Sequence, residues 1–240
     1  FGDDDRISEA DPVIALHYRP FRGWQITGGT IDRNHPLHEG IFWDALRYTE
    51  PIEQGIQFKG NMKHLRQDLW VSWERRETTN QREKFAVGNY TEVKWNGFSL
   101  DGQFYWIHFG GQKFIFQTVS ATGTRTSNNI SLALGGGYTW TPDRPDLTFF
   151  KEAGFRVHYL YQKDKAAGLQ DIDESGVTVH GWVNLWGFNF FGRIWSADGS
   201  NFNSRRGDIE QPGVALSKGN PLYRSEDFQE IGLYKVWHLA

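Results

Sequence analysis

The sequence contains no cysteine and a single methionine, and it has no long run of apolar residues. The absence of cysteine excludes a disulfide-stapled fold and any thiolate metal site. A transmembrane helix needs about 18 or more consecutive apolar residues, and no stretch approaches this length. Charge of one sign is not in excess either, because 26 basic and 29 acidic residues give a net charge of −3. No basic surface for nucleic acid is therefore predicted.

Aromatic residues and glycine are abundant instead. The 240 residues include 11 Trp, 9 Tyr, 18 Phe and 27 Gly. Aromatic and β-branched residues favour strands, and no convincing helical period is present. The composition therefore predicts an all-β protein. Mean hydropathy is low at −0.60, which is also compatible with a membrane β-barrel, because a barrel strand needs an apolar residue only at every second position.

Apolar and polar residues alternate with a period of two along almost the whole chain. Leu69, Val71 and Trp73 alternate in this way with their neighbours, and Val177 and Val179 do so later. The pattern predicts about eleven strands. Many of them are close to the roughly 9–11 residues that a tilted membrane strand requires.

The links between these predicted strands alternate in length. Short links at 20–22, 62–64, 96–97, 141–146 and 187 alternate with long links at 32–53, 76–83, 108–128, 163–175 and 198–227. Asn96-Gly97 is the preferred two-residue hairpin turn, because both residue types tolerate a positive φ. A hairpin extension is expected at 114–120 within one long link. Outer-membrane barrels keep short turns on the periplasmic side and long loops outside, so the alternation favours a barrel over a soluble sandwich.

The segment Gln67 to Trp73 and the hairpin from Trp95 through Asn96-Gly97 to Gln103 carry this pattern most clearly. With them the whole chain resembles bacterial outer-membrane β-barrel proteins of the porin-like kind. The resemblance implies an antiparallel transmembrane up-and-down β-barrel, with residues 1–240 as one domain in the outer membrane of a Gram-negative bacterium.

Such barrels have an even strand number and both chain ends on the periplasmic side. One strand before Phe1 would give about twelve strands, and a further hairpin after Ala240 would give about fourteen. The chain stops at Leu239-Ala240 instead of the terminal aromatic residue that these barrels usually carry. We therefore expect sequence to be missing at one or both ends.

The same alternation predicts which residues line the barrel interior. They are His17, Arg19, Lys59, Asp68, Glu74, Glu92, Lys94, Asp101, Arg156, His158, His180 and Arg193. Five are basic and four acidic when histidine is not counted, so no ion selectivity is predicted. A twelve-stranded lumen is narrow, and opposed charges could pair across it. The set is therefore either a satisfied polar core or a pathway for solutes.

Five aromatic residues are predicted to point inward: Trp70, Tyr105, Trp182, Trp186 and Trp195. Inward aromatic rings are unusual in an aqueous channel. They could stack on sugar rings or on an apolar solute, or they could pack the interior. Packing is the simpler interpretation.

One loop carries residue types that can ligate a metal, namely His35-Pro36-Leu37-His38-Glu39. Two His and a carboxylate would suit zinc, but the spacing matches no established site, so no metal and no cofactor are predicted. The loop is expected to fold over the barrel mouth. Two acidic runs, at 3–5 and 171–174, lack the glycine and spacing of a calcium loop. They are interpreted as solvated loops.

Catalytic motifs are absent as well. The sequence has no Gly-x-Ser-x-Gly elbow, and Ser72 and His180 could meet only if the fold brought them together. Gly135-Gly136-Gly137 is interpreted as a bend or the close approach of a loop. The chain is therefore predicted not to be an enzyme.

The predicted function is that of a channel or porin for small solutes, or of a structural membrane component. Two alternatives stay open: a partner-docking barrel whose long loops bind a protein or surface polymer, and a soluble Trp-rich β-sandwich that binds carbohydrate. The predicted partners are outer-membrane lipid and lipopolysaccharide. Small polar solutes or another envelope protein are further candidates, and nucleic acid is not.

Overall fold

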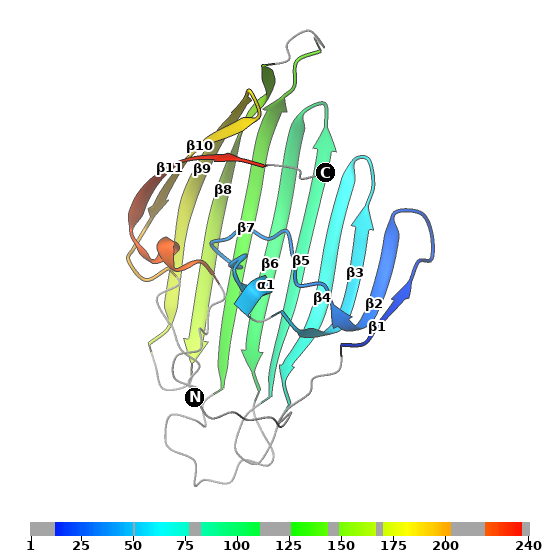
Figure 1. Ribbon diagram of the computed structural model, residues 1–240. Helices are drawn as coiled ribbons and strands as arrows, with labels where there is room; N and C mark the ends of the chain where they lie inside the picture. The colour runs from blue at the N-terminus through cyan, green and yellow to red at the C-terminus, as the bar shows by residue number, and fades with distance from the viewer. Residues whose placement is uncertain are drawn as a thin grey trace, which may run out of the picture.

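The computed structural model describes residues 13–49, 51–76, 83–110, 126–143, 149–166, 170–202 and 219–236. They form one antiparallel sheet of eleven strands that follow one another in chain order (Figure 1). The strands are β1 (Ala15–Tyr18), β2 (Trp24–Ile31), β3 (Glu53–Asn61), β4 (Leu65–Arg75), β5 (Lys84–Trp95), β6 (Phe98–Phe109), β7 (Ser127–Trp140), β8 (Phe150–Ala166), β9 (Ile172–Leu185), β10 (Phe188–Ala197) and β11 (Asp227–Lys235). The predicted all-β, up-and-down arrangement is confirmed.

Helical structure in the described residues amounts to one turn of α-helix, α1 (Leu46–Thr49), and one 3₁₀ turn, η1 (Pro221–Arg224). No helix in the described part of the chain is long and apolar enough to cross a bilayer.

Two tight hairpins fix the register at the short-turn end of the sheet. Asn96 and Gly97 have φ values of 47° and 83°, and Trp186 and Gly187 have φ values of 52° and 76°. Both turns therefore place two consecutive residues at positive φ, as the right-handed twist of a hairpin favours. The second turn contains Trp186 as well as the predicted Gly187.

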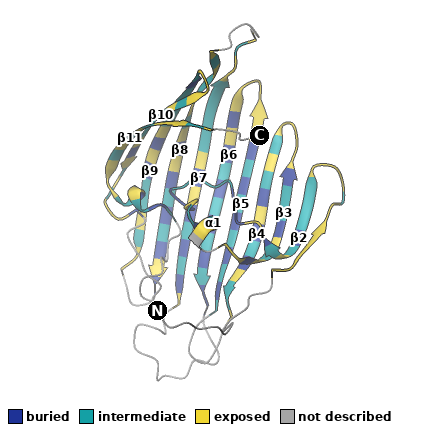
Figure 2. Cartoon of the chain, in the orientation of Figure 1, coloured by how far each residue is buried: buried dark blue, intermediate teal, exposed yellow. Residues whose placement is uncertain are grey.

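Alternate residues face opposite sides of the sheet, and the apolar side is the exposed one. Exposed apolar side chains on this outer face include Leu16, Ile56, Leu69, Val93, Leu100, Leu134, Val157, Val179, Ile194 and Ile231. Polar side chains such as Gln57, Asp68, Glu92 and Gln103 are buried on the other face. Figure 2 shows the resulting alternation of buried and exposed bands along the strands. This is the reverse of a soluble sandwich, in which the apolar faces would be covered.

The segment between β2 and β3 folds into the concave side of the sheet, where α1 lies in front of the central strands (Figure 1). Its Ile41 and Phe42 join a buried apolar cluster with Tyr105, Ile107 and Leu160 of the wall. Tyr223 of η1 belongs to the same cluster. The segment therefore packs against the interior instead of covering a mouth, because its apolar residues match the few apolar positions on the inner face.

The long links differ from expectation at the end of β8. Lys163 pairs with Asp173 and Asp164 with Ile172, so most of the predicted loop 163–175 is strand. Ion pairs support this extension, with Lys163 Nζ 2.6 Å from Asp173 Oδ2. The expected hairpin at 114–120 and the acidic run 3–5 lie outside the described residues.

Candidate functional site

A histidine–aspartate pair lies on the inner face, and a glycine separates its two members. Asp101 of β6 pairs with Gly135 of β7, which in turn pairs with His158 of β8. The Nε2 atom of His158 lies 3.2 Å from each carboxylate oxygen of Asp101. The imidazole therefore reaches across β7 to a partner two strands away.

Gly135 makes this contact possible. A Cβ atom at this position would lie 2.1 Å from Cδ2 of His158 and 2.7 Å from Oδ2 of Asp101. Any side chain would therefore displace the pair. Gly137 does the same for Arg156, whose Cγ would lie 2.6 Å from an added Cβ. The glycine run 135–137 therefore leaves room for the side chains of His158 and Arg156 of β8. It is not the bend or loop contact that the sequence predicts.

His38 approaches this pair from the segment between β2 and β3, which we call the inserted segment. Its ring centroid lies 4.8 Å from that of His158, and its backbone NH donates to Oε1 of Gln103. Its Nδ1 accepts a hydrogen bond from the backbone NH of Gly40 at 3.0 Å. Burial, together with His158 and Arg193, holds the pKa of His38 well below its ordinary value. His38 is therefore neutral at pH 7, with its hydrogen on Nε2.

A cavity of about 210 Å³ lies between these residues. Its lining consists of Pro36, Leu37, His38, Glu39, Gln103, Arg156, His158, His180 and Arg193. The cations in it have acidic partners: Arg193 contacts Glu39, and Arg156 contacts Glu92. The cavity thus combines imidazole nitrogens with paired cations.

A second histidine, His35, is enclosed more tightly. Its ring stacks on Trp70 at a centroid distance of 3.5 Å. Its Nδ1 lies 3.0 Å from Asp68 and its Nε2 3.1 Å from Glu53, and Arg33 also binds Glu53 at 3.0 Å. Burial alone would lower the pKa of His35, but the hydrogen bonds to both carboxylates outweigh it and raise the pKa. Both ring nitrogens are engaged, so we assign this cluster a structural role.

Replacing His35 with glutamine is expected to lower the free energy of unfolding by about 1–3 kcal/mol, because buried carboxylate oxygens lose their partner. Folding raises the pKa of His35, so it favours the protonated ring. This contribution is complete below the unfolded value near 6.5 and is lost as pH rises through the folded-state value. Urea unfolding should therefore show a larger difference from wild type at about pH 6 than at about pH 9. His64→Gln, at an exposed turn, is the control, and a difference that grows with pH would contradict this account.

No group of three or more His, Asp or Glu in the described ranges is arranged to hold a metal ion. The residues of the 35–39 run separate, because His35 turns toward Glu53 and Asp68 while His38 turns toward His158. Ser72 and His180 are also apart. Ser72 of β4 pairs with Ala86 of β5, whereas His180 of β9 pairs with Arg156 and Arg193.

The remaining charged residues of the predicted interior set form ion pairs or lie near the sheet edge. Glu74 lies 2.8 Å from Lys84, Lys94 lies 3.2 Å from Glu92 and Lys59 lies 2.7 Å from Asp32. His17 and Arg19 are exposed at the first strand, where His17 contacts Thr27 and Arg19 donates to Gln25. None of these lines the cavity beside His158.

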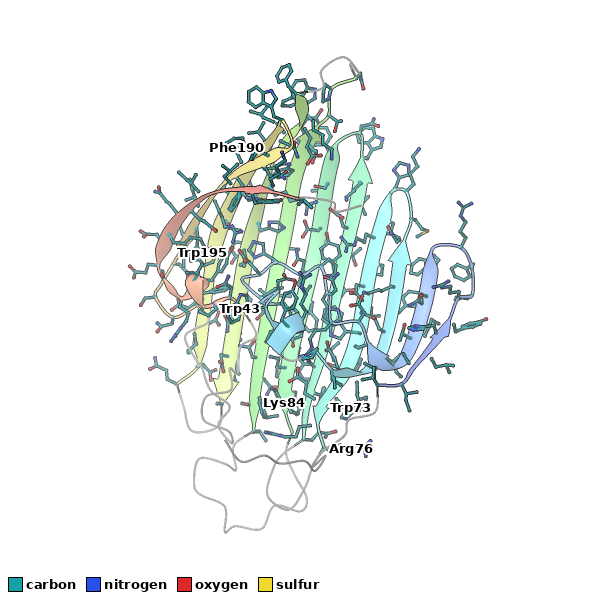
Figure 3. All side chains as sticks on the ribbon, viewed as in Figure 1. Trp43, Trp73, Arg76, Lys84, Phe190 and Trp195 are labelled. Atoms are coloured by element: carbon teal, nitrogen blue, oxygen red, sulfur yellow. The ribbon has the colours of Figure 1, made fainter. Side chains whose placement is uncertain are left out.

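The five predicted inward aromatic residues have different environments. Trp70, Tyr105 and Trp195 are buried in the apolar cluster, and Trp195, labelled in Figure 3, donates from Nε1 to the carbonyl of Ser225 at 2.9 Å. Trp182 borders a second cavity. Trp186 does not point inward, since it lies in a turn, is 66% exposed and contacts Phe149. Strand alternation stops at Leu185, so it could not place Trp186.

Sequence reasoning missed His38, Gln103 and Tyr223 as parts of the site. Gln103 follows Asp101 by two positions, so period-two alternation could have assigned it to the same face. The residue types of the 35–39 run indicate His38 only as a possible metal ligand. No local signal indicated Tyr223, whose hydroxyl accepts from Nη1 of Arg193 at 3.2 Å. Burial raises the pKa of Tyr223 to about 12.

Comparison with known families gives a match over the whole chain. Residues 1–240 match the family described as lipid A 3′-O-deacylase-type. No curated protein matches the chain. The family description names an enzyme, so the predictions of a porin, of solute transport and of a non-enzymatic protein were wrong. The docking barrel and the carbohydrate-binding sandwich do not match the family either. The chain belongs to the lipid A 3′-O-deacylase-type family.

Proposed function

We propose that this chain is an outer-membrane esterase that releases an acyl chain from lipid A, at the 3′ position named in the family description. The observation that carries the proposal is the pair of His158 and Asp101 beside a cavity, with neutral His38 next to it. Ester hydrolysis needs a base for water and a donor for the carbonyl oxygen. We propose His158 as the base and His38 as the donor.

The hydrogen bonds support the following proposed roles. Asp101 accepts from Nε2 of His158, which leaves Nδ1 of His158 as the basic nitrogen. Nδ1 takes a proton from water as the water oxygen attacks the ester carbonyl. His38 donates from Nε2 to the carbonyl oxygen as negative charge develops there. The bond to the sugar oxygen then breaks, and His158 returns the proton to that oxygen, which gives a carboxylic acid and a free hydroxyl.

The outer face supports a membrane location. Exposed apolar side chains occur on strands from β1 to β11, for example Leu16 at 77% and Ile231 at 92%. A large exposed apolar surface marks contact with lipid or a partner. Outer-membrane lipid, lipopolysaccharide included, is therefore the partner that we propose. The family match does not support the predicted small solutes or protein partners.

The test is incubation of the purified protein, in detergent micelles, with hexa-acylated lipid A, followed by mass spectrometry. We expect loss of the 3′-linked acyl group. Gly135→Ala should abolish the reaction, since its Cβ would displace both His158 and Asp101. Gly102→Ala is the matched control, because its Cβ on the outer face would meet only Leu134 Cδ2, at 3.8 Å. Unchanged lipid A with the wild-type protein, or equal activity of the two variants, would refute the proposal.

A further inference from the structure

Positive charge gathers where the first two hairpins end, at the short-turn end of the sheet. The hairpins β1–β2 and β3–β4 are adjacent, because β2 pairs with β3 (Figure 1). Their ends comprise residues 18–25 and 59–65, which we call the basic corner. These residues include no Asp or Glu, although the whole chain has a net charge of −3. The cations of the basic corner are Arg19, Arg22, Lys59 and Lys63.

The four cations differ in their partners. Lys59 is balanced, because its Nζ lies 2.7 Å from Oδ2 of Asp32. Arg19 donates from Nε to the neutral amide oxygen of Gln25 at 3.2 Å, and Arg22 and Lys63 are exposed turn residues. Among the residues that the structure describes, the ion pairs of the basic corner are those of Lys59. The excess positive charge therefore lies with Arg19, Arg22 and Lys63.

A pocket of about 640 Å³ lies between the two hairpin ends. None of the described residues that line it carries a carboxylate, so its charge favours an anion. The backbone fixes its shape, because the NH of Asn61 donates to the carbonyl of Gly23 at 2.7 Å and ties the two turns together. The lining consists of Arg19, Phe21, Arg22, Gly23, Trp24, Gln25, Lys59 and Asn61.

Aromatic rings connect this pocket to the apolar outer face. The Trp24 ring lies 4.7 Å from Phe58 and 6.0 Å from Phe21. Phe58 pairs across strands with Leu69 of the outer face. Gly60 leaves room for the Trp24 ring, since an added Cβ would lie 2.6 Å from its Cζ3. Aromatic rings at the end of an apolar surface are typical of the boundary between membrane and water.

We propose that the basic corner binds the headgroup of an anionic phospholipid on the periplasmic side of the outer membrane, where short turns lie. The inference rests on the membrane location in the proposed function, but not on the proposed reaction. Arg19 and Arg22 would bind the phosphate through charge-assisted hydrogen bonds. Phe21 and Trp24 would contact the glycerol and the first carbons of the acyl chains.

The combination of charge and aromatic rings selects this class of ligand. A water-soluble phosphate would leave the two rings unused. A lipid without net charge would leave the excess cations without a counter-charge. An anionic phospholipid uses both, because its phosphate and its apolar part are only a few bonds apart.

Native mass spectrometry of the full chain in detergent micelles tests the proposal. The ligands are ether-linked phosphatidylglycerol, ether-linked phosphatidylcholine and glycerol 3-phosphate, and the ether bonds exclude hydrolysis. We expect phosphatidylglycerol to bind at least about tenfold more tightly than either of the others. Equal binding of phosphatidylcholine, or of glycerol 3-phosphate, would overturn the proposal.

This measurement is separate from the test of deacylation, because no lipid A is present. A chain that prefers phosphatidylglycerol but leaves lipid A intact would refute the proposed reaction alone. A deacylase without this preference would refute the lipid site alone.

Matched variants locate the bound lipid. Arg22→Gln should weaken phosphatidylglycerol binding by about tenfold, and folding should tolerate it because Arg22 is an exposed turn residue. The control is Lys151→Gln, which removes an exposed cation beside Glu152, at the short-turn end of β8. Equal losses in the two variants would indicate general attraction to surface charge and would refute the site.

A second pair of variants tests the aromatic contact. Trp24→Ala should also weaken phosphatidylglycerol binding by about tenfold. Its control is Trp73→Ala, which removes an exposed ring from the opposite end of the outer face (Figure 3). Wild-type affinity in Trp24→Ala, or an equal loss in Trp73→Ala, would contradict the proposed contact.

Discussion

Replacing His158 with asparagine is expected to lower kcat for acyl release from lipid A by about 10²- to 10⁴-fold, the usual contribution of a positioned general base. The side chain meets the cavity and is held by Asp101 at 3.2 Å, so its loss removes the base without opening the apolar cluster. KM should change little, since proton transfer occurs only in the transition state. Steady-state kinetics with lipid A in micelles measures both constants.

Asp101→Asn should also lower kcat for acyl release, but through a change in the tautomer of His158. The amide would donate to Nε2 of His158 and thereby move the ring proton to Nδ1, where it blocks the basic position. His64→Asn is the control for histidine loss, because the His64 side chain is exposed at a turn, where its Nδ1 lies 3.0 Å from the carbonyl oxygen of Lys94. If His158→Asn and His64→Asn were equally active, the catalytic assignment would be wrong.

Val179→Arg is expected to lower the free energy of unfolding by about 2–4 kcal/mol, the cost of a cation that faces lipid near the bilayer midplane. Val179 is 41% exposed and lies midway along β9, between Val157 and Ile194 on its neighbours. Urea titration of protein folded into lipid vesicles measures the cost.

The control is Val93→Arg, next to the Asn96-Gly97 turn. Val93 is 51% exposed, but at the membrane interface the same substitution costs only about 0–1 kcal/mol. A cost that is equal at the two positions, or larger at Val93, would mean that the outer face does not contact lipid in the way proposed.

Strands and their two faces could be predicted from the sequence because both depend on local alternation. Leu69 and Val71 lie outside and Asp68 lies inside for the same reason, namely that successive side chains point to opposite sides. The Asn96-Gly97 turn was predictable because its chemistry is contained in two residues.

The candidate site depends instead on contacts between distant parts of the chain. Asp101 and His158 meet only because β6, β7 and β8 pair in one register, and His38 joins them only because its segment folds inward. No spacing in the sequence records such a register. Nor does this arrangement resemble a serine hydrolase motif, so no local signature in the sequence indicates it.

The packing of the inserted segment is a second feature that could not be predicted from the sequence. Its apolar residues Ile41 and Phe42 lie in the predicted long link 32–53, and alternation gives no indication of what such a link packs against. The partners that bury them, Tyr105 and Ile107 among them, come from β6. A few apolar positions on a mostly polar inner face were enough to hold the segment there.

Nine glycines of the sheet fall into two groups by their expected tolerance of alanine. Gly88, Gly135, Gly154, Gly176 and Gly232 each lie beneath a ring, with an added Cβ between 2.0 and 2.4 Å from it. At Gly28, Gly102, Gly181 and Gly192 no atom would lie closer than 3.8 Å to an added Cβ. Natural variation and laboratory libraries should therefore replace the second group with alanine far more readily than the first.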